Sequence, residues 1–66
     1  MIEVETTYVI LEGIRFIEFV NNSRMLITYK DGNTINIYVK SWDNYKKYAD
    51  EIMLAINHKG ENEIQN

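Results

Sequence analysis

The stretch that decides the fold reads Met25-Leu26-Ile27-Thr28-Tyr29-Lys30-Asp31-Gly32-Asn33-Thr34-Ile35-Asn36-Ile37-Tyr38-Val39. Apolar and polar residues alternate on both sides of an Asp-Gly pair, which is typical of a β-hairpin. A three-residue loop from Lys30 to Gly32 pairs Ile27 with Ile35 and places the apolar residues of both strands on one face. A two-residue loop would place them on opposite faces. We therefore expect the three-residue loop, with Gly32 in the left-handed conformation.

A helix is predicted after this hairpin. Ser41 is a good N-cap, and Asp43 in the first turn suits the helix dipole. We expect the helix to run from about Trp42 to Asn57, with Gly60 just past its end. Apolar residues recur at steps of three and four and form one stripe: Tyr45, Tyr48, Ala49, Ile52, Met53 and Ile56.

Two further strands are predicted before the hairpin. Residues 2–11 alternate, and Glu12-Gly13 reads as a tight turn that would pair Leu11 with Ile14 and Val9 with Phe16. The next strand, 14–20, breaks its own alternation. Either a β-bulge re-aims this strand, or both of its faces are covered.

These elements predict an α+β fold: a four-stranded antiparallel sheet followed by one C-terminal helix, or ββββα. We expect a single domain over residues 1–60 and a flexible polar tail over residues 61–66. The helix can pack on only one face of the sheet, so the other face is expected to lack a covering layer.

Size and composition limit the chemistry. The chain has 66 residues, no cysteine and one histidine, so neither a disulfide framework nor a four-ligand zinc site is expected. No cofactor is expected either, because no glycine-rich phosphate loop is present. The start lacks a signal-peptide pattern, and the apolar runs are too short to span a bilayer, so we expect a cytoplasmic protein.

The net charge of −3 is unevenly distributed. Residues 1–20 hold four glutamates and one arginine, whereas residues 21–60 hold six basic and four acidic side chains. This pattern differs from the basic stripe of a non-specific nucleic-acid binder. Nucleic acid is therefore a less favoured partner than protein.

Three groups of side chains are candidates for chemistry or binding. His58, the one histidine, is read as a surface residue at the helix end rather than as a catalytic base. If the first hairpin pairs as expected, Glu3, Glu5 and Glu18 share one sheet face. They are solvated strand residues or, in the more specific interpretation, an acidic strip that binds a partner protein.

An apolar cluster is the candidate for self-association. In the predicted first hairpin, one face carries Val9, Leu11, Ile14 and Phe16. An exposed apolar patch marks an interaction site, although the hairpin could also curl and bury both faces. The sequence slightly favours the interface, and a two-fold homodimer is its simplest form.

The leading functional hypothesis is a small non-enzymatic protein–protein interaction domain, such as an inhibitor or modulator of a host protein encoded by a phage or mobile element. The alternative is a small nucleic-acid-binding transcriptional regulator that uses Arg24, Lys40, Lys46 and Lys47. Lys46 and Lys47 are spaced to pair with Asp50 and Glu51 along the helix, which favours a solvated helix face instead.

The order of strands and helix from Glu12-Gly13-Ile14-Arg15-Phe16-Ile17-Glu18 to Ser41 resembles that of LytTR-type DNA-binding domains. The resemblance extends over roughly half the chain. It implies a sheet followed by a helix. No residue role is carried over, because the chain lacks the basic loops that such domains use on DNA.

Overall fold

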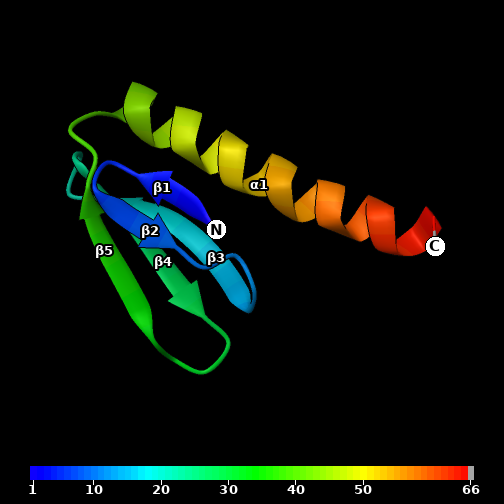
Figure 1. Ribbon diagram of the computed structural model, residues 1–66. Helices are drawn as coiled ribbons and strands as arrows, with labels where there is room; N and C mark the ends of the chain where they lie inside the picture. The colour runs from blue at the N-terminus through cyan, green and yellow to red at the C-terminus, as the bar shows by residue number, and fades with distance from the viewer. Residues whose placement is uncertain (66) are drawn as a thin grey trace.

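The computed structural model describes the backbone of residues 1–65 and the side chains of residues 1–58. In this part of the chain, two short strands are followed by three longer strands and a helix (Figure 1). The elements are β1 (Ile2–Val4), β2 (Thr7–Val9), β3 (Ile14–Val20), β4 (Arg24–Tyr29), β5 (Thr34–Tyr38) and α1 (Trp42–Gln65). The α+β class with one C-terminal helix is confirmed. The single four-stranded sheet is wrong, because the strands form two antiparallel sheets, β1–β2 and β3–β4–β5.

The β4–β5 hairpin has the predicted register. Ile27 lies opposite Ile35, and the Tyr29 N–H donates a 2.9 Å hydrogen bond to the Asn33 carbonyl across the loop. Gly32 has a φ of 92°, the left-handed conformation that the three-residue loop requires. The apolar residues of both strands therefore share one face of the sheet.

A β-bulge resolves the broken alternation of β3. Ile14 lies opposite Tyr29 and Phe16 opposite Thr28, so Arg15 is the additional residue in β3. After the bulge, Ile17 lies opposite Ile27, which brings it to the apolar face of the sheet. The first of the two alternatives raised by the sequence is thus the correct one.

The N-terminal segment differs from its prediction. Residues 2–11 do not form one strand along β3 but fold back on themselves, with Ile2 opposite Val9. The turn lies at Glu5-Thr6, and Glu5 has a φ of 55°. The expected pairing of Val9 with Phe16 across a Glu12-Gly13 turn is therefore wrong.

The reason for this difference lies in burial. A fourth strand in the same layer would have left the helix alone to cover the apolar face of the sheet. Folded back, the β1–β2 hairpin contributes a second covering element, and its Val4 and Val9 are fully buried. Tyr29 ties the end of this hairpin to the sheet, since its hydroxyl donates a 2.6 Å hydrogen bond to the Ile10 carbonyl.

The hydrophobic core lies between the β3–β4–β5 sheet on one side and the β1–β2 hairpin and α1 on the other. Its buried members come from all three parts: Val4, Val9, Met25, Ile27, Ile37, Val39 and Ile52. The helix continues past the strands towards the C-terminus (Figure 1). The β1–β2 hairpin and α1 thus cover one face of the three-stranded sheet.

The helix begins as predicted. The Asn44 N–H donates to Ser41 Oγ at 3.4 Å, so Ser41 is the N-cap. However, α1 ends at Gln65 and not near Asn57, so Gly60 lies within it. One glycine costs a helix only about 1 kcal/mol, and no proline follows to stop it. The division into a domain of residues 1–60 and a flexible tail of 61–66 stays a prediction, and residue 66 lies outside the described residues.

An aromatic cluster joins the start of α1 to β3. The rings of Phe19, Trp42 and Tyr45 have centroids 5.0 to 5.4 Å apart. The Tyr45 hydroxyl also donates a 3.3 Å hydrogen bond to the Ile17 carbonyl. These contacts place the helix beside β3.

Candidate functional site

The second face of the β3–β4–β5 sheet has no covering layer in the described part of the chain. Its nine side chains form three cross-strand rows, because the registers of the two strand pairs coincide. We call this surface the open face. From β3 through β4 to β5, its rows are Phe16–Thr28–Thr34, Glu18–Leu26–Asn36 and Val20–Arg24–Tyr38.

The open face mixes apolar and polar groups. None of its nine side chains is buried, and Phe16 and Tyr38 are 45% and 54% exposed. Leu26 lies in the middle row on the central strand. Aromatic and arginine side chains are enriched at protein interfaces. Such interfaces usually have an apolar centre and a polar rim.

Two arginines hold positions next to the aromatic rings of this face. The Arg24 guanidinium carbon lies 5.6 Å from the centre of the Tyr38 ring, directly across the strand pair. The Arg15 guanidinium carbon lies 6.0 Å from the Phe16 ring. Such contacts are weakly attractive and orient the cation over the ring.

The structure does not bring the predicted apolar interface together. Val9 is fully buried, and Leu11 and Ile14 are half-buried against the core. Of the four residues, Phe16 belongs to the open face. The prediction relied on a hairpin between residues 2–11 and β3, and this hairpin does not form.

The three glutamates of the predicted acidic strip also lie apart. Glu3 is on the exposed side of β1, Glu5 is in the β1–β2 turn, and Glu18 is on the open face of the other sheet. Because the β1–β2 hairpin lies on the covered side of that sheet, the Glu18 side chain points away from Glu3 and Glu5. These residues form no continuous strip.

The candidate basic residues and His58 are exposed. Lys40 precedes α1, and Lys46 and Lys47 lie in its first two turns. Of the basic candidates, Arg24 is the one on the open face. The sequence predicts His58 at the end of the helix, but in the structure it lies within α1.

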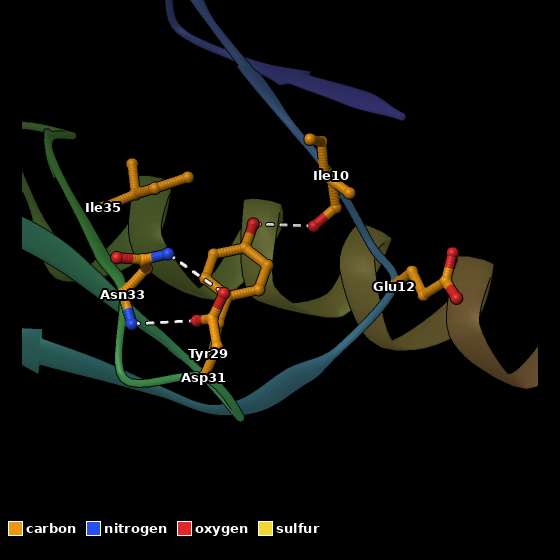
Figure 2. A pocket seen from close by; sticks show the side chains of 6 residues that line it. All are labelled: Ile10, Glu12, Tyr29, Asp31, Asn33 and Ile35. Atoms are coloured by element: carbon orange, nitrogen blue, oxygen red, sulfur yellow. Dashed lines mark hydrogen bonds between the residues drawn. The ribbon is translucent and has the colours of Figure 1, made fainter.

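A pocket of about 310 Å³ lies where the β2–β3 connection meets the β4–β5 loop (Figure 2). Asp31 accepts two 2.9 Å hydrogen bonds from Asn33, one from its backbone N–H and one from its side-chain amide. The Tyr29 hydroxyl is directed at the Ile10 carbonyl on the opposite wall (Figure 2). The polar groups of this pocket thus stabilise the loop and connect it to the hairpin.

A larger apolar groove of about 460 Å³ lies between β3 and α1. It is lined by Ile14, Arg15, Phe16, Ile17, Tyr45, Ala49, Met53 and Ile56. Met53 belongs to the predicted apolar stripe of the helix, but it is 52% exposed and lines this groove.

Two tyrosines have shifted titration. Burial, and then the charge of Asp31, raises the pKa of Tyr29 above its ordinary value of 10.0. Burial, and then the charge of Glu18, raises the pKa of Tyr45 in the same way. Both hydroxyls donate to backbone carbonyls, so these shifts accompany structural hydrogen bonds.

Sequence reasoning did not identify Leu26, Asn36 and Tyr38 as a surface. The signal was present, because the predicted β4–β5 register already places these three side chains on the face of the sheet that Ile27 and Ile37 do not occupy. What was missing was the position of β3 and the side on which the first hairpin lies.

Among the residues whose side chains are described, no three His, Cys, Asp or Glu side chains are grouped to hold a metal ion. In the same part of the chain, α1 is not apolar enough over its length to cross a membrane. Comparison with protein-family models, curated proteins and solved structures found no match to this chain.

Proposed function

We propose that the chain is a small non-enzymatic protein-binding domain that acts in the cytoplasm, and that its open face contacts the partner. The observation that carries this proposal is the uncovered face of the β3–β4–β5 sheet, with Leu26 at its centre. In this proposal, the domain acts as an inhibitor or modulator by occupying a surface of a larger protein.

The composition of the open face supports a protein partner. Phe16 and Tyr38 offer large, rigid contact areas at opposite corners, and Arg24 is oriented by the Tyr38 ring. Rigid strands lose little conformational entropy when they bind. Leu26 would occupy the centre of the interface, from which water is excluded.

A capture experiment tests this proposal. The tagged protein is incubated with lysate of the cells that produce it, and retained proteins are quantified for three chains. Leu26→Arg introduces a charge at the centre of the open face and is expected to reduce capture of the partner about tenfold or more. Ile10→Arg introduces the same charge at a side chain that is 60% exposed on the other side of the molecule, and it should capture the partner as wild type does.

Circular dichroism verifies that both variants are folded. If Leu26→Arg and Ile10→Arg capture the same proteins in the same amounts as wild type, the open face is not the binding surface.

One observation favours a second candidate, a single-stranded nucleic-acid binder. Arg24 and Tyr38 lie against each other on the surface of a sheet, and such platforms stack bases in known nucleic-acid-binding domains. Anisotropy titration with labelled oligonucleotides tests it. Binding that weakens steeply with salt supports it, and no binding at low salt contradicts it.

A further inference from the structure

Strand β3 is an edge of its sheet, and the hydrogen-bond pattern shows which of its backbone groups face outwards. The Tyr29 N–H donates to the Asn33 carbonyl, so Tyr29 directs its backbone groups towards β5. Successive residues of a strand face its two neighbours in turn. The backbone groups of Ile27 therefore also point towards β5. Those of its neighbour Leu26 point towards β3.

The alternation continues into β3. Glu18 lies opposite Leu26 and directs its backbone groups towards β4. Its neighbours Ile17 and Phe19 therefore direct theirs to the outer edge. The hydrogen bond from the Tyr45 hydroxyl to the Ile17 carbonyl is consistent with this, because α1 lies beside that edge. A carbonyl has two lone pairs, so the Ile17 carbonyl can accept a second hydrogen bond.

Two exposed apolar side chains lie beside this edge. The groove between β3 and α1 opens here, and Phe16 and Met53 on its rim are 45% and 52% exposed. An edge strand with a neighbouring apolar groove is a template for the addition of another strand.

We propose that two copies of the chain associate through β3, antiparallel about a two-fold axis that passes beside Ile17, into one six-stranded sheet. In an antiparallel pair, directly opposed residues have their side chains on the same face of the sheet. A two-fold axis between two adjacent residues would oppose side chains from different faces, so the axis must pass beside one residue and place it opposite its own copy. With Ile17 at the axis, the outward backbone groups of the two Ile17 residues pair, and Phe16 lies opposite Glu18 of the second copy.

Charge complementarity favours this register. The bulge places Arg15 beside Phe16, with its guanidinium carbon 6.0 Å from the ring. Arg15 therefore lies next to Glu18 of the second copy, and symmetry makes the contact twice. A shift of two residues that moves the axis to Glu18 would place the two Glu18 carboxylates against each other, which is unfavourable.

This arrangement also accounts for the groove. The two α1 helices lie on the same side of the joined sheet, so Met53 of one copy can contact the helix of the other and remove apolar surface from water. The open faces stay uncovered and join into one continuous surface. The inference goes beyond the proposed function, since it concerns the edge of the sheet and requires no partner protein.

Sedimentation equilibrium from low micromolar to millimolar concentration tests the proposal. Wild type is expected to dimerise. Arg15→Glu and Glu18→Arg, both at exposed positions, should each raise the dimer dissociation constant about tenfold or more, because each creates two like-charge contacts. Lys47→Glu, the matched charge reversal on the exposed side of α1, should leave the dissociation constant unchanged.

Two combinations of these substitutions make the test specific. The double variant Arg15→Glu, Glu18→Arg restores opposite charges at both contacts and should dimerise as wild type does. An equimolar mixture of the two single variants should form a heterodimer, because one chain then carries two acidic groups and the other two basic groups at the interface.

Three results would overturn the proposal. The first is a wild-type monomer at every concentration. The second is a dimer that neither single charge reversal weakens. The third is weakening by the single variants without recovery in the double variant or the mixture. The capture experiment with Leu26→Arg reports on the open face separately, so failure of one proposal is distinguishable from failure of the other.

Discussion

The Tyr29 hydroxyl donates a 2.6 Å hydrogen bond to the Ile10 carbonyl, across 19 residues of sequence. Tyr29 is at the end of β4, and Ile10 follows β2. The bond therefore joins the β1–β2 hairpin to the three-stranded sheet, and with it the layer that covers the core to the layer that carries the open face.

Removal of this hydroxyl should destabilise the fold. Tyr29→Phe keeps the ring but leaves the Ile10 carbonyl without its donor, and we expect the free energy of unfolding to fall by about 1 kcal/mol. Urea denaturation measures the change. An unchanged midpoint would mean that the bond between the layers contributes nothing.

Stability should decrease at alkaline pH. The pKa values of Tyr29 and Tyr45 are raised in the folded state above the ordinary value of 10.0, chiefly by burial. A raised pKa means that the neutral hydroxyls stabilise the fold fully below pH 10, and that this contribution is lost as pH rises through the folded-state pKa. The Tyr29→Phe, Tyr45→Phe variant should therefore lose less stability than wild type between pH 9 and pH 11, as measured by urea denaturation at each pH. Equal losses of stability in wild type and the variant would show that these two hydroxyls do not cause the pH dependence.

Truncation of Ile52 should weaken the packing of the helix on the core. Ile52 is fully buried, whereas Leu54, two residues later, is 58% exposed. Ile52→Ala should lower the free energy of unfolding by about 2–5 kcal/mol, because it removes buried methyl groups and leaves a cavity. Leu54→Ala, the matched truncation, should change it by less than about 0.5 kcal/mol. Similar effects of the two truncations would mean that α1 packs through a different face.

The turn between β1 and β2 is strained. Glu5 has a φ of 55°, in the left-handed region where a side chain costs about 1–2 kcal/mol. Glu5→Gly removes this cost but adds backbone entropy to the unfolded chain, so we expect a net stabilisation of about 0.5 kcal/mol. Glu5→Ala, which keeps the strain, is the control and should not stabilise the protein. Equal effects of Gly and Ala would show that the backbone at this position is relaxed.

The same turn explains what the sequence could not predict. Glu5-Thr6 has none of the usual turn residues, whereas Glu12-Gly13 has the glycine that a hairpin turn prefers. Local signals therefore placed the first turn at Gly13. Burial of Val4 and Val9 against the sheet outweighs those signals, so the hairpin turn forms at Glu5-Thr6. The predicted turn at Glu12-Gly13 is also present, but it connects the β1–β2 hairpin to β3.

Where burial and local signals agree, the sequence was sufficient. The register of β4 and β5 followed from the requirement that Ile27 and Ile35 share one face, and Ser41 marked the helix start. The predicted site residues depended on the first hairpin, so its misplacement moved Val9 and Ile14 from a supposed surface into or against the core.

The central claim is that the open face binds the partner, and a photo-crosslinking residue at position 36 tests it most directly. Asn36 is exposed in the middle row of the open face, on β5. The same residue placed at Tyr8, which is 66% exposed on the outer side of the β1–β2 hairpin, is the control. We predict that the partner is crosslinked from position 36 and not from position 8. Crosslinking from position 8 alone would contradict the account.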